Sequence, residues 1–458
     1  DVSAQLRVSR PPPRAMAPVG KHEAAQLASV HAQYEGLWLD YLKNRKDQAE
    51  QKAAALVRVL AAVPANQKNA EDWAAEADFC YILGAVRGDA AADLQRALSA
   101  YSSSLRCPGG EGNFNARRMT AETLLRLRRN EDAFRAFDEL AALQTDYSWE
   151  ELEVAPFRLR HDAALVERLV GAGRFDAKSG EEICSILRGI ARKVETEVVS
   201  ETNTRPCVKD LSPEDALALQ KGLFNELWRF APYPKARLEA WSGSASLPGP
   251  VLNPDVDWSR VEEEYLRTGI TVVDGFFSDA ALAELWAYAL EAPSFRTVRR
   301  GFLGSFPADG FTHPLVCRAV EALVGSMGRA LGGHSLSLWW LFKYSDAGPR
   351  GIGIHADAAA VNMNIWLTPD EGCASGGGLD IFKQVPPDDA AVPEYNHDME
   401  PGEEERLRAS LMAGGVEKVK YKQNRAAIFT SDLYHASQPF VFPDAGALPR
   451  VNLTLLFG

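Results

Sequence analysis

The chain has 458 residues, of which 46% are hydrophobic and 24% are charged, and its formal net charge at pH 7 is -12. This length exceeds what one compact core usually holds, so we expect two or three domains. The acidic balance argues against a general nucleic-acid-binding surface, which is normally basic. No stretch approaches the roughly 18 uninterrupted apolar residues that a membrane-spanning helix needs.

The first 20 residues carry four prolines and three arginines, which predicts a flexible lead or the remnant of a targeting segment. The six cysteines are scattered and lack the spacing of a metal site. We interpret them as free thiols of a soluble protein in a reducing compartment, cytoplasmic or organellar. A bridge between Cys184 and Cys207 is the alternative for a secreted protein.

Residues 21–199 are rich in alanine, leucine, arginine and glutamate with helical spacing. Three similar polar turns begin at Arg87, Arg129 and Gly173, 42 and 44 residues apart, and each lies between two apolar helices. Helix, turn and helix, with an aspartate near the second helix start, is the plan of tetratricopeptide-like pairs, whose usual period is about 34. We predict a divergent tetratricopeptide-like array, with an irregular helical bundle as the alternative.

A connector rich in proline and tryptophan follows at residues 200–258, and its aromatic residues indicate that it packs on a surface. From residue 259 to 458 strand-like segments dominate, and helices predicted at 279–292 and 314–331 should pack on the resulting sheet.

The segment His355-Ala356-Asp357 stands between two apolar strand-like stretches, at 336–344 and 361–369. Alternate side chains of an extended segment point the same way, so His355 and Asp357 can act together. Two imidazoles and one carboxylate can occupy one face of an octahedral iron(II). The second imidazole must come from a strand folded alongside, and His435 follows the apolar stretch 425–429. His397, in an acidic, loop-like stretch, is the alternative.

In order, these motifs resemble the iron(II)- and 2-oxoglutarate-dependent dioxygenases over roughly residues 260–458. They are an aromatic strand ending in Tyr344, a glycine turn at 345–348, H-x-D, a Gly-Gly-Leu strand at 376–382, His435 before Ala-Ser, and a late arginine, Arg450. The resemblance implies a double-stranded β-helix (jelly-roll) domain, and therefore an α+β multidomain chain.

The same resemblance implies that His355, Asp357 and His435 bind Fe(II), with 2-oxoglutarate and O2 as cosubstrates and ascorbate as a candidate stimulant. Succinate and carbon dioxide would be released, and hydroxylation is the usual outcome, with desaturation or cyclisation as alternatives. Relatives that halogenate carry a small residue in place of the aspartate, so Asp357 argues against halogenation.

The resemblance also implies that Arg450 binds the distal carboxylate of 2-oxoglutarate, a role that suits its planar guanidinium. A surface arginine is the alternative. Thr454 lies on the same strand face, and the Tyr344 hydroxyl is a further candidate donor, with a plain core tyrosine as its alternative. Asn362 and Asn364 share one face of an apolar strand, where two amides would be costly in a dry core. A polar cavity that holds the cosubstrate would explain them.

Three functions remain open from the sequence. The first is hydroxylation of a protein or peptide side chain recruited by the helical region, the second is oxygenation of a small metabolite with a structural or oligomerising helical domain, and the third is an inactive scaffold. An apparent insertion at residues 384–415 is either a lid over the site or an ornament.

Overall fold

The computed structural model describes residues 33–41, 43, 45–143, 148–200, 203–242, 248–299, 301–344, 351–387, 390, 392–397, 399–443 and 446–458. The predicted lead at 1–20 and the predicted turn at 345–348 lie outside these residues. In the described part of the chain, no helix is both long and apolar enough to cross a lipid bilayer. All six cysteines are unpaired, including Cys184 and Cys207.

The N-terminal half is helical, and the three predicted turns each join two packed helices. Gly88 and Gly173 adopt positive φ angles of 71° and 67° in the first and third turns, a conformation that glycine adopts without strain. Asp176 caps the helix after the third turn by accepting a hydrogen bond from the Ser179 amide. The helices are α2 (Lys46–Ala61), α3 (Ala70–Val86), α4 (Ala91–Arg106), α5 (Phe114–Arg126), α6 (Asn130–Leu143), α7 (Pro156–Gly171) and α8 (Ala177–Lys193).

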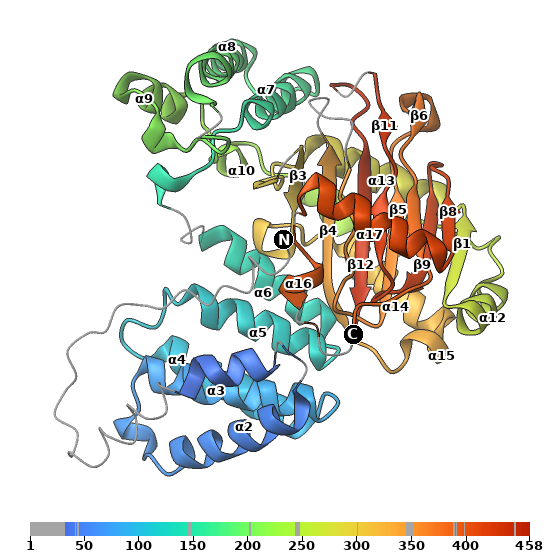
Figure 1. Ribbon diagram of the computed structural model, residues 1–458. Helices are drawn as coiled ribbons and strands as arrows, with labels where there is room; N and C mark the ends of the chain where they lie inside the picture. Colours follow the sequence, from blue (N-terminus) through green and yellow to red (C-terminus); the bar gives the residue numbers. More distant parts are fainter. Residues whose placement is uncertain are drawn as a thin grey trace.

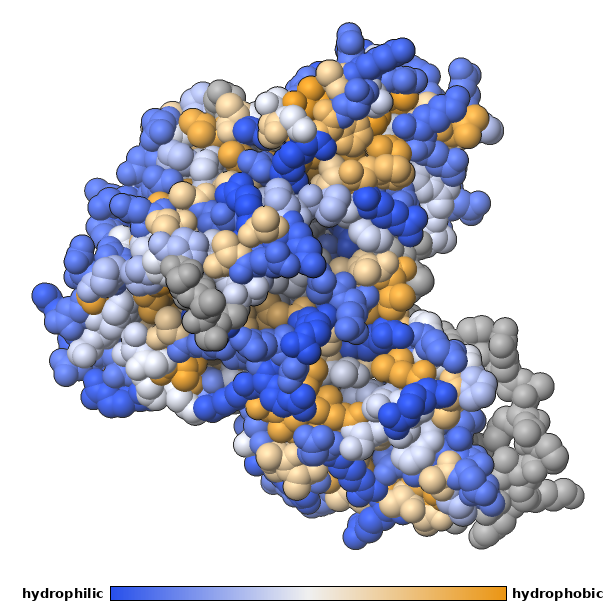
Figure 2. Space-filling model, turned by 180° about the vertical axis from the view of Figure 1, so that it is seen from behind, coloured by the Kyte–Doolittle hydropathy of each residue, from blue (hydrophilic) through white to orange (hydrophobic). Residues whose placement is uncertain are grey.

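These helices do not share one continuous core. Helices α2 to α5 enclose one apolar cluster, and α7, α8, α9 (Pro213–Lys221) and α10 (Leu227–Phe230) enclose another. The two lobes stand apart in Figure 1, and the outline seen from behind is indented between them (Figure 2). The helix pairs are therefore present, but a continuous tetratricopeptide-like array is not confirmed.

The C-terminal half is built on antiparallel sheets. A seven-stranded sheet has the order β1-β9-β5-β12-β4-β3-β2, a three-stranded sheet the order β10-β7-β8, and a short sheet pairs β11 with β6. The strands are β1 (Ile270–Asp274), β2 (Thr297–Arg299), β3 (Phe302–Ser305), β4 (Leu336–Tyr344), β5 (Val361–Trp366), β6 (Ser375–Gly376), β7 (Leu379–Phe382), β8 (Val416–Val419), β9 (Arg425–Thr430), β10 (His435–Ser437), β11 (Phe440–Val441) and β12 (Val451–Phe457).

Side-chain alternation gives the large sheet two different faces. Val361, Met363 and Ile365 of β5 point into a core covered by helices, which include α12 (Trp258–Thr268), α13 (Asp279–Glu291) and α14 (Pro314–Ser326). The two predicted sheet-packing helices are thereby confirmed, the second ending in a separate short helix, α15 (Gly328–Leu331). The opposite face packs Trp366 against the three-stranded sheet, and that layer carries the candidate site.

Helices α5 and α6 belong to the core of the large sheet, although they precede the predicted boundary at residue 199. Phe134 of α6 stacks on Trp339 of β4 with ring centroids 4.2 Å apart, and Phe137 meets the same indole edge-on. Tyr233 and Trp241, in the connector that carries α11 (Lys235–Ala240), are buried in this core too. The packing therefore crosses the predicted boundary.

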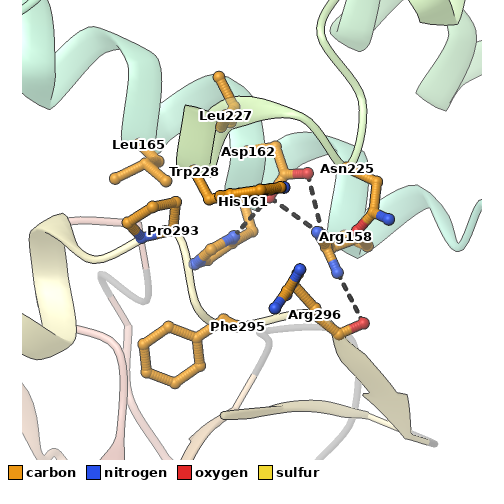
Figure 3. Close-up of a pocket in the computed structure, with 10 residues that line it drawn as sticks. All are labelled: Arg158, His161, Asp162, Leu165, Asn225, Leu227, Trp228, Pro293, Phe295 and Arg296. Atoms are coloured by element: carbon orange, nitrogen blue, oxygen red, sulfur yellow. Dashed lines mark hydrogen bonds and ion pairs between the residues drawn. The ribbon is translucent and has the colours of Figure 1, made fainter. Parts of the chain in front are cut away.

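Helix α7 meets β4 through buried polar groups. Arg158 donates to Asp162 and to the main-chain carbonyl of Arg296 (Figure 3). His161 lies 3.0 Å from Asp162 through Nδ1, and its Nε2 is 2.9 Å from Nζ of Lys343 on β4. The space among these side chains is about that of a single water molecule, so we interpret it as structural packing.

Candidate metal centre

His355, Asp357 and His435 come together as the sequence predicts. Their candidate ligand atoms all lie within 4.8 Å of one another. Asp357 Oδ2 is 3.6 Å from Nε2 of His435, and Asp357 Oδ1 is 4.0 Å from Nε2 of His355. The main chains of His355 and His435 exchange hydrogen bonds of 3.0 and 2.8 Å, so the second histidine does arrive on a segment paired with the H-x-D segment.

Both imidazoles are oriented by their own main chain. Nδ1 of His355 is 2.9 Å from the Gly353 carbonyl, and Nδ1 of His435 is 3.0 Å from the Leu433 carbonyl. A carbonyl can only accept, so each Nδ1 carries a proton, and each Nε2 faces Asp357, where it can offer a lone pair to a cation. This tautomer is the one that a metal-bound histidine needs, and the carbonyl partner is typical of metal sites.

The protonation states also suit a cation. Burial, and then the neighbouring His435, lower the pKa of His355 to about 4, so its ring is neutral at pH 7. Burial raises the pKa of Asp357, but the facing His435 and His355 and the hydrogen bond from Asn396 outweigh it and hold that pKa below its usual range. The site therefore presents one carboxylate and two imidazoles, that of His355 being neutral, and these are ligands that iron(II) accepts.

Arg450 lies immediately before β12 and is 2% exposed. Its guanidinium donates to the Gly377 carbonyl at 2.9 Å and to the amide oxygen of Asn452 at 3.4 Å. The Tyr344 ring lies under it, with 4.4 Å from the guanidinium carbon to the ring centroid, and Phe440 is at 5.0 Å. Among the described residues, these partners include no carboxylate, so a buried positive charge lacks an anion.

Several buried polar atoms on this face have no hydrogen-bond partner within the described protein. They include the amide oxygens of Asn362 and Asn364 on β5, the indole nitrogens of Trp340 and Trp366, and the hydroxyl of Ser431. Buried polar atoms are nearly always bonded, so an unpaired set in one layer indicates a ligand or water position. The residues present thus fit a bound cation and an anionic cosubstrate.

The other sequence candidates lie in different surroundings. His397 is outside the metal-ligand cluster of the described residues. Two other cations of the sheet have different partners, because Lys343 contacts His161 and Arg425 pairs with Asp274. Thr454 accepts a hydrogen bond from Asn452, on the face that also holds Arg450.

Sequence reasoning missed Asn396. Its side-chain nitrogen donates to Asp357 Oδ1 at 3.1 Å and to the Ala356 carbonyl at 2.9 Å. The stretch drew attention only for its neighbour, His397. An amide next to aromatic Tyr395 in an otherwise acidic segment was the available signal.

No protein-family model matches the sequence, and no curated protein matches it. Solved structures similar to part of the chain include SnoN, described as a non-heme alpha ketoglutarate dependent epimerase from nogalamycin biosynthesis (14% identity, 44% of this chain, 82% of that chain, TM-score 0.32). A second is a Pseudomonas putida prolyl-4-hydroxylase (15% identity, 45% of this chain, 96% of that chain, TM-score 0.29). A third is EctD from S. alaskensis with 2-oxoglutarate and 5-hydroxyectoine (18% identity, 46% of this chain, 81% of that chain, TM-score 0.31). All three TM-scores lie below 0.5.

Proposed function

We propose that the chain is an Fe(II)- and 2-oxoglutarate-dependent dioxygenase whose antiparallel sheets form a double-stranded β-helix. In this proposal His355, Asp357 and His435 bind the iron, and Arg450 binds the distal carboxylate of 2-oxoglutarate. The observation that carries it is the pairing of a two-histidine, one-carboxylate cluster with a buried arginine that lacks a carboxylate partner among the described residues.

Arg450 is the residue through which the chain would distinguish this cosubstrate. A guanidinium can donate two parallel hydrogen bonds to a carboxylate, and the gain is large where water is excluded. The Tyr344 and Phe440 rings both pack against the guanidinium, which restricts its orientation. Asn364 and Thr454, on neighbouring strands, line the same layer and would contact the body of the cosubstrate.

When bound, iron(II) and 2-oxoglutarate would supply the oxidation, with dioxygen consumed and succinate and carbon dioxide released. The protein's own contribution is to hold two Nε2 lone pairs and one carboxylate in a fixed arrangement. It also buries the centre, since the side chains of Asp357 and His435 are 3% and 4% exposed. His355 is the most open of the three at 15%, so we infer that substrate approaches on its side.

A side chain of a protein or peptide, recruited by the helical lobes, is our first choice of substrate class. A small metabolite is the second, and one observation favours it. Helices α5 and α6 cover the face of the large sheet opposite to Asn362 and Asn364, so this helix pair adds no wall to the site. The two classes can be separated by dialysing a cell extract and adding each fraction to the enzyme. A protein substrate stays in the retained fraction and a metabolite passes through the membrane, so the fraction that stimulates succinate release identifies the class.

The test uses the full chain with added Fe(II), 2-oxoglutarate and oxygen. Wild-type protein should bind one iron and release succinate, whereas His355→Ala and Asp357→Ala proteins should do neither and should keep their helical circular dichroism. Iron-dependent succinate release that persists in these variants would refute the assignment. Absence of turnover in a wild-type protein that binds iron tightly would support the inactive scaffold.

Arg450→Ala tests the cosubstrate assignment separately. Removing one partner of a buried charged pair costs about 3–5 kcal/mol, or roughly two to three and a half orders of magnitude in affinity. We therefore expect a matching rise in the apparent KM for 2-oxoglutarate with iron binding unchanged, and only partial recovery in Arg450→Lys. Arg425→Ala is the matched control, because Arg425 lies on β9 of the same sheet but pairs with Asp274.

A further inference from the structure

Two asparagine amides bind the two oxygens of Asp357. Asn362, on β5, donates to Oδ2 at 2.9 Å, and Asn396 donates to Oδ1 at 3.1 Å. Asn396 and Asn362 are 5% and 1% exposed. If the oxygen and nitrogen of either amide exchanged places, an amide oxygen would face a carboxylate oxygen, and both can only accept. Both side-chain nitrogens must therefore point at Asp357.

The two asparagines come from very different parts of the fold. Asn362 belongs to the large sheet, whereas Asn396 follows the short helix α16 (Val392–Tyr395) inside the 384–415 segment. The second N–H of Asn396 donates to the Ala356 carbonyl at 2.9 Å, between the two proposed metal ligands of the H-x-D segment. This one side chain therefore fixes both the carboxylate and the main chain that carries it.

Several described residues around Asn396 are packed in place. Helix α17 (Pro401–Ala413), which lies in front of the sheet in Figure 1, contributes Leu411 to an apolar cluster that also contains Ile354, Ala356 and Tyr434. Arg408 of α17 pairs with Asp380 of β7 at 3.3 Å. Tyr395, which directly precedes Asn396, packs against the same cluster, so Asn396 is held next to an anchored residue.

Resting on the proposed function, we propose that Asn396 is a positioning residue of the metal centre and that the 384–415 segment is a structural part of that centre. By holding Oδ1, Asn396 sets the rotation of the Asp357 carboxylate toward the two Nε2 atoms. Hydrogen bonds that orient a metal ligand from outside typically contribute 10- to 100-fold to metal affinity. The segment is therefore neither an ornament nor a detachable lid.

The experiment measures Mn(II) binding to the full chain by electron paramagnetic resonance and visible absorption of the Co(II)-loaded protein. The main variant is Asn396→Leu, which keeps the shape of asparagine and removes its donors. We expect its Kd for Mn(II) to rise about 10- to 100-fold and its Co(II) bands to shift. The adjacent His397→Ala is the matched control and should stay within about twofold of wild type.

Two further measurements separate positioning from folding and from the proposed function. Asn396→Gln keeps an amide and should recover part of the affinity, and urea unfolding in EDTA shows whether a variant is folded without metal. If wild type and His355→Ala bind Mn(II) equally, the metal centre itself is wrong. If His355→Ala abolishes binding but folded Asn396→Leu binds Mn(II) as wild type does, only the role of Asn396 is wrong.

Discussion

The buried side chain of Lys343 predicts how the stability of the protein depends on pH. This lysine is 6% exposed, its Nζ contacts Nε2 of His161 at 2.9 Å, and the Phe295 ring lies 4.0 Å from it. Burial first, then Arg168 and Arg158, lower its pKa to about 7, although Asp162 opposes the change. The folded protein thus holds a largely neutral amine at slightly alkaline pH.

The sign of the effect follows from the two protonation states. The ordinary pKa of lysine is 10.5, so between pH 7 and 10.5 the unfolded chain binds a proton that the folded chain does not. Stability must therefore rise with pH across this window and level off below pH 7, where both states are protonated. The difference between the two pKa values corresponds to roughly 5 kcal/mol, of which about 3 kcal/mol falls between pH 7 and 9.5.

The substitution Lys343→Met removes this titration and keeps a long apolar side chain. The loss of the His161 contact should be constant over the window, because burial and Lys343 lower the pKa of His161 to about 4. We measure the unfolding free energy of both proteins with urea. From pH 7 to 9.5 that of wild type should rise by about 3 kcal/mol more than that of the variant. The control is Lys418→Met, an exposed lysine on β8. Parallel curves for wild type and Lys343→Met would refute the neutral buried amine.

Two other predictions follow from the packing and the metal centre. His435→Ala should abolish Fe(II) binding and succinate release while His397→Ala should leave both nearly intact, as measured by metal analysis and turnover; the reverse result would move the site into the 384–415 segment. Phe134→Ala should cost about 3–5 kcal/mol of unfolding free energy, because its ring stacks on Trp339 in the sheet core, and Trp fluorescence should report that loss. A loss confined to helical circular dichroism, with the sheet domain unaffected, would show that α6 is not part of that core.

The parts of the site that sequence reasoning predicted depend on local alternation. The side chains of His355 and Asp357 meet because they are two positions apart in an extended segment, and the hydrogen bonds from Arg450 to Asn452 and from Asn452 to Thr454 repeat that spacing on β12. Such a period can be read without knowledge of the fold. The choice of His435 over His397 rested on the apolar strand before it and on the Ala-Ser pair that follows it.

The parts that escaped prediction depend on contacts between distant segments. Nothing local to Phe134 indicates that it stacks on Trp339 instead of on a neighbouring repeat, so the sequence does not show that apolar packing extends across residue 199. Asn396 sits 39 residues from Asp357, in a stretch whose composition is typical of a loop. An asparagine becomes a positioning residue only through the partner that folding brings to it.

Strand β4 connects the helical region to the proposed site. Trp339 and Lys343 point to the helix-covered face, where they meet Phe134 and His161, whereas Tyr344 points to the other face and lies under Arg450. Two successive residues of this strand thus contact different partners: Lys343 contacts His161 of α7, and Tyr344 contacts the guanidinium of Arg450. Close-packed protein interiors are hard to compress and therefore transmit strain. A displacement of α7 would for this reason also displace the backbone of β4 and, with it, Tyr344. The helical region therefore contacts the strand that also carries Tyr344, from the face of the sheet opposite to the proposed cosubstrate pocket.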